Sequence, residues 1–180
     1  MQVYLFLADG FECIEAMAPV DVFRRAGINI TTVSLTSSIT VTSSNGVEVK
    51  ADATLGSVDI LGGDALILPG GYPGYENLKK NDAVGRAVSL YYETGRVVGA
   101  ICAAPIVLQH YGIGYGRKIT CHRCIKDDMK DFVYTGKPVE TDGSLVTAIG
   151  AGHALDFGLA LLEKLCGTGA VEKVKPGMEL

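Results

Sequence analysis

The sequence is poor in charge and contains no run of basic residues. Of its 180 residues, 20% are Asp, Glu, Lys or Arg, and the formal net charge is −4 at pH 7. Nucleic-acid-binding domains are typically basic, so we expect no nucleic acid as a partner. The hydrophobic fraction of 48% is far higher than that of a disordered chain. The length fits one folded domain over residues 1–180.

Long apolar runs are also absent, which bears on where the protein acts. No segment reaches the roughly 18 uninterrupted apolar residues of a transmembrane helix. The N-terminus, Met1-Gln2-Val3-Tyr4, has neither the basic region nor the cleavage site of a secretory signal. We therefore expect no membrane partner and a cytoplasmic location, in which the five cysteines remain free thiols.

Short apolar segments alternate with segments of helical character along the chain. Three segments are apolar without polar alternation, which is typical of strands buried on both faces of a parallel sheet. They are residues 3–8, 65–68 and 97–101. The expected helices are residues 14–25, 82–92, 103–111 and 153–165. This alternation predicts an α/β fold with a doubly wound, mainly parallel sheet that is sandwiched by helices.

Several local signals refine this prediction. Turn residues at 44–46 and at 142–143 predict two hairpins as additions to the sheet. Pro19 lies inside the first expected helix and predicts a kink or a late start. The polar tail, residues 172–180, contains a Pro-Gly break, and we expect it to be loosely held or to pack on a partner.

Cys102 is the first candidate for a functional side chain. It falls where a buried strand turns directly into a helix, and its small neighbours allow the sharp turn of a nucleophile elbow. A thiol at this position faces the positive end of the helix, which lowers its pKa and favours the thiolate. The alternative interpretation is a buried structural cysteine, because free cysteines are among the most buried residues.

Two other expected strand ends carry residues that could complete an active site. Gly70 and Gly71 follow one strand, and their backbone N–H groups could join that of Ala103 in an oxyanion site, although a plain turn would look the same. Glu15 follows the first strand and could hold a proton beside the thiolate. An exposed glutamate in a first helical turn is its alternative interpretation.

His122 is a further candidate, since it could approach Cys102 as a base or proton relay. A histidine in a polar surface loop is an equally good interpretation. Cys121 and Cys124 form a single C-x-x-C pair, which supplies only two of the ligands that a zinc site needs. We therefore expect neither a metal site nor a cofactor.

Several motifs occur in one order along the chain and together resemble a known family. They are Phe11-Glu12-Cys13-Ile14-Glu15-Ala16, Pro19-Val20-Asp21-Val22, Arg24-Arg25-Ala26-Gly27, Leu68-Pro69-Gly70-Gly71 and Ala100-Ile101-Cys102-Ala103-Ala104-Pro105. The sequence resembles the ThiJ/PfpI superfamily, which is related to class I glutamine amidotransferases, and within it the branch of DJ-1 and its bacterial relatives. The resemblance extends over nearly the whole length.

The resemblance implies a flavodoxin-like α/β sandwich that is usually a homodimer. It also implies that Cys102 is the reactive, oxidisable nucleophile and that Glu15 is its hydrogen-bonded acid. Gly71 and Ala103 would form the oxyanion site, with His122 nearby. Activities of this branch include cofactor-independent conversion of glyoxals to hydroxy acids, deglycation of glyoxal adducts, chaperone behaviour and oxidative-stress sensing.

The sequence departs from the pattern of relatives at several positions. Ala103 stands where the intracellular-protease branch has a histidine, which lowers the case for a peptidase. Asn45 stands where close relatives often carry an arginine, whereas Arg25 is retained as a possible anion or dimer-site contact. Cys13 and Cys121 are additions, and either could resolve an oxidised Cys102.

Together these observations predict a cysteine-dependent glyoxalase or deglycase that acts on reactive dicarbonyls or their adducts under carbonyl or oxidative stress. A redox-sensing, chaperone-like protein that is switched by oxidation of Cys102 to a sulfinic acid is the alternative. A cysteine peptidase or an amidotransferase-like hydrolase is a less favoured hypothesis.

Overall fold

A computed structural model describes all 180 residues and shows one seven-stranded sheet as its centre. Its strands, in spatial order, are β10 (Val139–Asp142), β11 (Leu145–Ala148), β7 (Val97–Ile101), β6 (Ala65–Leu68), β1 (Gln2–Leu7), β2 (Asn29–Ser34) and β5 (Ala53–Thr54). Neighbouring strands are parallel except for the antiparallel hairpin of β10 and β11. The sheet is therefore doubly wound and mainly parallel, as the sequence predicts.

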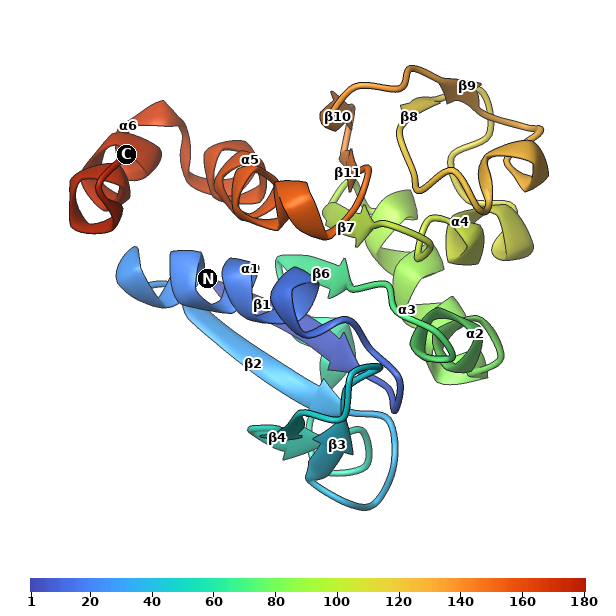
Figure 1. The fold of residues 1–180 in the computed structure, drawn as a ribbon, viewed down its shortest axis with the longest axis horizontal. Helices are drawn as coiled ribbons and strands as arrows, with labels where there is room; N and C mark the ends of the chain where they lie inside the picture. Colours follow the sequence, from blue (N-terminus) through green and yellow to red (C-terminus); the bar gives the residue numbers. More distant parts are fainter.

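Two small sheets lie outside the central one. The antiparallel pair β3 (Thr40–Thr42) and β4 (Glu48–Lys50) forms the hairpin that its turn residues predict. The parallel pair β8 (Lys118–Ile119) and β9 (Val133–Tyr134) lies beside the other end of the central sheet, near β10 (Figure 1).

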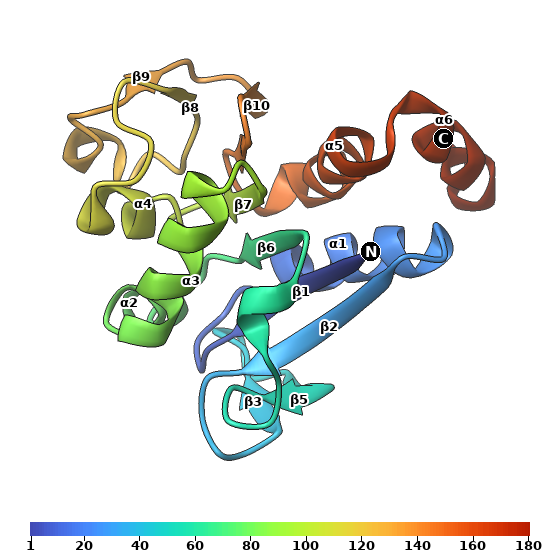
Figure 2. The same ribbon diagram turned by 180° about the vertical axis from the view of Figure 1, so that it is seen from behind.

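Helices cover both faces of the sheet (Figures 1 and 2). They are α1 (Cys13–Arg25), α2 (Gly74–Lys79), α3 (Asp82–Glu93), α4 (Ile106–Tyr111), α5 (Ala154–Cys166) and α6 (Thr168–Val174), with the 3-10 turns η1 (Ile60–Gly62), η2 (Lys126–Asp128), η3 (Ala151–His153) and η4 (Lys175–Met178). The helices α1, α5 and α6 pack on one face, and α2, α3 and α4 pack on the other.

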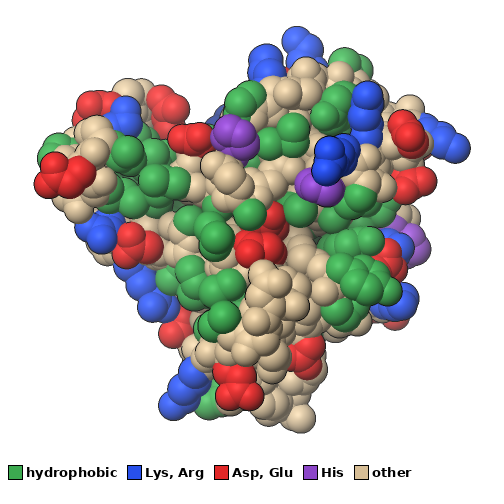
Figure 3. All heavy atoms as spheres, in the orientation of Figure 1, with side chains coloured by type: hydrophobic (Ala, Val, Ile, Leu, Met, Phe, Trp, Pro, Cys, Tyr) green, Lys and Arg blue, Asp and Glu red, His purple; other side chains and the backbone are tan.

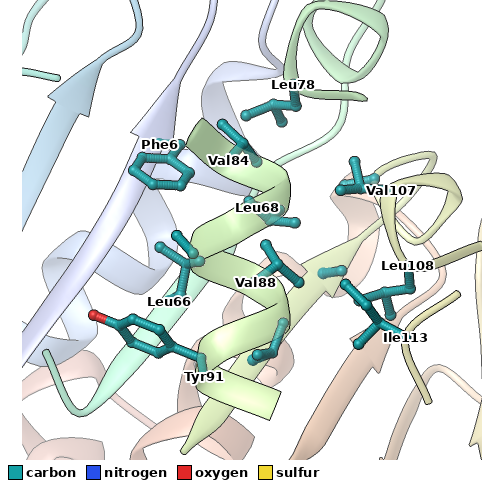
Figure 4. Packing of buried hydrophobic residues seen from close by; sticks show 14 of the residues in the cluster. Phe6, Leu66, Leu68, Leu78, Val84, Val88, Tyr91, Val107, Leu108 and Ile113 are labelled. Atoms are coloured by element: carbon teal, nitrogen blue, oxygen red, sulfur yellow. The ribbon is translucent and has the colours of Figure 1, made fainter. Parts of the chain in front are cut away.

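The alternation of side chains along β1 explains why residues 3–7 of this central strand contain no charged or amide side chain. Val3, Leu5 and Leu7 point into the core shared with α1 and α5. Tyr4 and Phe6 point into the opposite core, against α3. Figure 4 shows this second core, in which the side chains of α3 lie over those of β1 and β6. Helices on both faces therefore require apolar residues at every position of the strand.

Two further features are the apolar character of the helices and the charge on one face of the surface. None of the helices combines the length and the apolar character that a span would need. On the face drawn in Figure 3, lysine and arginine side chains are scattered among acidic ones rather than gathered into one patch.

Three local expectations need correction. The helix expected from residue 103 begins at Ile106, because residues 102–105 form a turn. Pro19 does not delay the first helix, which starts at Cys13. The tail is not loosely held: it continues from α6 into η4, with Val174 buried and the Gly177 carbonyl accepting a hydrogen bond from Arg25 Nη1 at 2.8 Å.

Truncation of one central leucine should reveal how much this core contributes. Leu66 is 0% exposed in β6, so Leu66→Ala is expected to cost about 2–5 kcal/mol of unfolding free energy. Leu61 is 45% exposed in η1, so Leu61→Ala should change stability by no more than about 0.5 kcal/mol. Urea denaturation measures both changes, and equal effects of the two variants would contradict the assigned core.

Candidate active site

Three neighbouring strands end at one edge of the sheet, and each is followed by a segment that the sequence singles out. In spatial order these strands are β7, β6 and β1. Because they are parallel, their carboxyl ends lie together, which is where open α/β sheets bind ligands. Cys102 follows β7, Gly70 and Gly71 follow β6, and Glu15 lies in the first turn of α1, just after β1.

Cys102 has the strained backbone of a nucleophile elbow. Its φ of 63° is left-handed, and Glu179 near the C-terminus is the only other non-glycine residue with a positive φ. Hydrogen bonds hold this conformation on both sides: the Cys102 N–H donates to the Ala148 carbonyl at 2.9 Å, and the His122 N–H donates to the Cys102 carbonyl at 2.8 Å. The sheet and the segment after β8 therefore fix the direction of the side chain.

Gly70 brings the Cys102 and Glu15 side chains together. A Cβ atom at position 70 would lie 2.7 Å from Glu15 Oε2 and 2.8 Å from Cys102 Cβ, so any side chain there would push the two groups apart. The Gly70 N–H also donates to Glu15 Oε2 at 2.8 Å. The glycine thus serves both as a spacer and as a donor that orients the carboxyl group.

The Glu15 carboxyl group is buried and only partly satisfied. The residue is 1% exposed, and its second oxygen, Oε1, has no N–H or O–H donor. Burial raises the pKa of Glu15 from 4.5 to about 7, and the adjacent Cys102 thiol and the Gly70 N–H oppose this shift. Near neutral pH this carboxyl group is therefore poised to hold or to release a proton, and the interpretation of an exposed first-turn glutamate is wrong.

The thiol of Cys102 does not have the lowered pKa that its place before a helix suggests. Burial raises the pKa of Cys102, and the Glu15 carboxylate raises it further, while the Ala103 N–H acts in the opposite direction. Two such groups titrate as a pair because the charge on one disfavours the charge on the other. The thiolate therefore forms most readily in the state in which Glu15 carries the proton.

Backbone N–H groups beside the thiol are free to bind an oxyanion. The Gly71 N–H donates to no protein acceptor, and the Ala103 N–H faces the Cys102 sulfur. Gly71 has a φ of 91°, and a Cβ atom there would collide with the backbone of Glu12. The segment after β6 is therefore more constrained than a plain turn: its Gly70 N–H binds Glu15, and its Gly71 N–H has no protein acceptor.

The side chains of His122 and Arg25 make no hydrogen bond to the pair of Cys102 and Glu15. The backbone of His122 adjoins Cys102, but its imidazole Nδ1 accepts a hydrogen bond from the Cys124 N–H at 3.2 Å, and the ring contacts neither Cys102 nor Glu15 through a hydrogen bond. Arg25 lies ten residues after Glu15 on α1, or about 15 Å along its axis. Its guanidinium binds Asp21 and the Gly177 carbonyl, so Arg25 does not belong to this site.

The C-x-x-C pair contributes one thiol to the surface. Cys121 is fully buried, whereas Cys124 is exposed. Nowhere in the structure do three or more His, Cys, Asp or Glu side chains gather in a way that could hold a metal ion.

Tyr75, which no sequence motif indicated, also faces this region. It lies on the short helix α2, which starts soon after Gly71 and was not expected from the sequence. Burial raises the pKa of Tyr75, and so do the nearby charges of Glu76, Cys124, Tyr72 and Cys102. No local pattern could have identified it, because its relation to the thiols exists only in the folded chain.

Comparison with known proteins agrees with this geometry. A model of the DJ-1/PfpI family matches residues 1–164. The chain belongs to this family. It is 35% identical over 175 residues to a "Parkinson disease protein 7 homolog" from Danio rerio, which covers 95% of this chain and 93% of the relative.

Further relatives support the same assignment. The chain is 32% identical over 158 residues to "Glutathione-independent glyoxalase DJR-1.2" from Caenorhabditis elegans, covering 87% of this chain and 83% of the relative. The crystal structure of Drosophila melanogaster DJ-1beta superposes with a TM-score of 0.95 at 32% identity, covering 99% of this chain and 97% of the other. These similarities confirm the family resemblance and the flavodoxin-like α/β fold of the DJ-1/PfpI family.

The unusual carboxyl group should make stability depend on pH. The folded state raises the pKa of Glu15 from 4.5 to about 7. The contribution of Glu15 to the free energy of unfolding is therefore complete below about pH 4.5 and is lost as the pH rises through about 7. Between these limits, wild type should lose up to about 3 kcal/mol of unfolding free energy relative to Glu15→Gln. Urea denaturation across the pH range measures this difference, which would stay constant if Glu15 were ionised throughout.

Proposed function

We propose that this member of the DJ-1/PfpI family is a cysteine-dependent glyoxalase or deglycase that needs no cofactor and acts on small reactive dicarbonyls or their adducts. The observation that carries the proposal is the buried pair of Cys102 and Glu15, with the pKa of Glu15 raised to about 7. A nucleophile beside an acid that gains and loses a proton near neutral pH suits a reaction that moves protons between adjacent carbons. The printed name of the Caenorhabditis elegans relative describes a glyoxalase and supports the same chemistry.

The first step is attack by the Cys102 thiolate on the aldehyde carbon of the dicarbonyl. A carbon–sulfur bond forms, the carbonyl π electrons move to oxygen, and a hemithioacetal results. The N–H groups of Gly71 and Ala103 stabilise the negative oxygen, and Gly70 keeps Glu15 beside it. Glu15 then supplies the proton that this oxygen takes up.

The second step transfers a proton between the two substrate carbons. The Glu15 carboxylate removes the proton from the carbon bound to sulfur and returns it to the neighbouring carbon, while the hydroxyl proton of the hemithioacetal passes to the ketone oxygen, which leaves an α-hydroxy thioester. Water attacks the thioester, the carbon–sulfur bond breaks, and the hydroxy acid leaves while Cys102 regains its thiolate. His122 takes no step in this scheme, because its ring accepts a hydrogen bond from the Cys124 N–H and has none with Cys102 or Glu15.

Substitution of the paired residues should separate their roles. Cys102→Ala should abolish the loss of methylglyoxal, because no covalent adduct forms, and Glu15→Gln should lower kcat by about 100-fold or more. Cys166→Ala is the matched control, since Cys166 ends α5 and is not part of the site. Methylglyoxal consumption and hydroxy-acid formation are the measurements, and full activity of Cys102→Ala would refute the proposal.

The same pair also supports a redox-sensing, chaperone-like function as a second candidate. Cys102 is only partly buried, and Glu15 Oε1 has no donor, so an oxidised sulfur could share the carboxyl proton. Treatment with mild peroxide should then oxidise Cys102 before the other cysteines, as intact mass and peptide mapping would show. Resistance of Cys102 to peroxide combined with fast dicarbonyl turnover would eliminate this candidate.

We also propose that the chain acts as a homodimer in the cytoplasm. All five cysteines are free, as expected in a reducing compartment. Ile14 and Val47 are 57% and 48% exposed, and the segments that carry them are joined by a hydrogen bond from the Ser44 N–H to the Phe11 carbonyl at 2.8 Å. This apolar surface beside the site is suited to contact with a second copy.

A further inference from the structure

A tight turn fastens a second thiol next to the reactive one. The His122 N–H donates to the Cys102 carbonyl at 2.8 Å, and the Ile125 N–H donates back to the His122 carbonyl at 3.1 Å. The Cys124 N–H donates to the His122 ring at 3.2 Å and so folds the turn onto itself. One hydrogen bond therefore joins the turn to the backbone of Cys102, and two more within the turn fix Cys124 relative to His122.

Within this turn, only Cys124 has a thiol that is available for chemistry. Cys121 and Ile125 are buried on either side of it and anchor the turn, whereas Cys124 is exposed. The Cys124 side chain lines a cavity of about 400 Å³ together with Tyr75 and with Ile106, which begins the helix after Cys102. A negative charge on Cys124 raises the pKa of the Cys102 thiol and that of Tyr75, which places all three groups in one local environment.

The two cysteines are joined by a short path through the fold. The Cys102 carbonyl accepts a hydrogen bond from the His122 N–H, and Cys124 follows His122 by two residues. A disulfide requires that the two Cα atoms lie about 7 Å or less apart. Arg123 and Cys124 are exposed, so core packing does not hold this part of the turn in place.

We propose that Cys124 resolves an oxidised Cys102 by forming an intramolecular Cys102–Cys124 disulfide. This bond would protect the reactive sulfur from irreversible oxidation. The inference assigns this role to Cys124 in place of Cys13 and Cys121. Cys121 is sealed in the core, and Cys13 lacks the hydrogen-bonded connection to Cys102 that the turn of Cys124 has.

The chemistry requires one hydroperoxide as the oxidant. The Cys102 thiolate attacks a peroxide oxygen, the S–O bond forms as the O–O bond breaks, and the leaving hydroxide takes the proton that Glu15 carries. The sulfur of Cys124 then attacks the Cys102 sulfenic acid, the S–S bond forms, and the S–O bond breaks as water departs with the Cys124 proton. The two sulfurs lose two electrons in total, and the peroxide gains them.

The test treats the reduced, full-length protein with two equivalents of hydrogen peroxide, which is enough to take one thiol to the sulfinic acid, blocks free thiols and maps the peptides without reduction. Wild type should give a peptide pair joined through Cys102 and Cys124, and dithiothreitol should restore both thiols. Cys124→Ser should give no such pair, and its Cys102 should continue to the sulfinic acid, which dithiothreitol does not restore. Cys166→Ser is the matched control and should behave as wild type.

A second measurement is independent of any enzymatic activity. Dimedone should trap the Cys102 sulfenic acid only briefly after peroxide addition in wild type, and for longer in Cys124→Ser. Circular dichroism of the variant verifies that it is folded. Equal yields of sulfinic acid in wild type and Cys124→Ser would overturn the inference. A disulfide from Cys102 to Cys13, to Cys121 or to a second chain would overturn it as well.

Discussion

The Glu15 carboxyl and the Cys102 thiol share one buried environment, and the chemistry of the site depends on their mutual electrostatic effect. Each group loses hydration, and each would repel the negative charge of the other. Near neutral pH the carboxyl group gains and loses a proton while the thiol keeps its own, and the sulfur becomes a thiolate most readily when the carboxyl group is protonated. A helix terminus alone would not produce this state, since burial here outweighs the effect of the Ala103 N–H on the thiol.

The remaining structure serves to bring these two groups together. Three parallel strands end at one edge, and the order β7-β6-β1 places the segment containing Gly70 between Cys102 and Glu15. Because Gly70 has no side chain, Cys102 and Glu15 can approach each other, and the Gly70 N–H orients the carboxyl group. The two helical layers hold the strand ends apart from solvent, so the pKa of Glu15 rises. This arrangement requires a strained backbone at Cys102. Hydrogen bonds with two different segments, at Ala148 and at His122, hold that backbone in place.

Much of this arrangement could be predicted from the order of residues. The elbow at Cys102 follows from an apolar strand that meets a helix with small residues between them, and the pairing of Glu15 with Cys102 follows from the family resemblance. Gly70 was expected as an oxyanion donor, but its N–H binds Glu15 instead. The pKa of the thiol could not be predicted, because it depends on which charges lie nearby and how deeply they are buried. The arrangement of His122 was anticipated only in part: its backbone adjoins Cys102, while its ring binds the turn that carries Cys124.

The sequence by itself determined the α/β class, the strands that need apolar residues on both faces, and the candidate nucleophile, because these depend on local periodicity and on single residue types. Tertiary structure decided the partners: that Glu15 is buried against Cys102, that Arg25 lies at the far end of its helix, and that the turn carrying Cys124 is hydrogen-bonded to the backbone of Cys102. These relations join segments that are distant in the chain. Their electrostatic consequences appear only after the sheet has brought those segments together and excluded water.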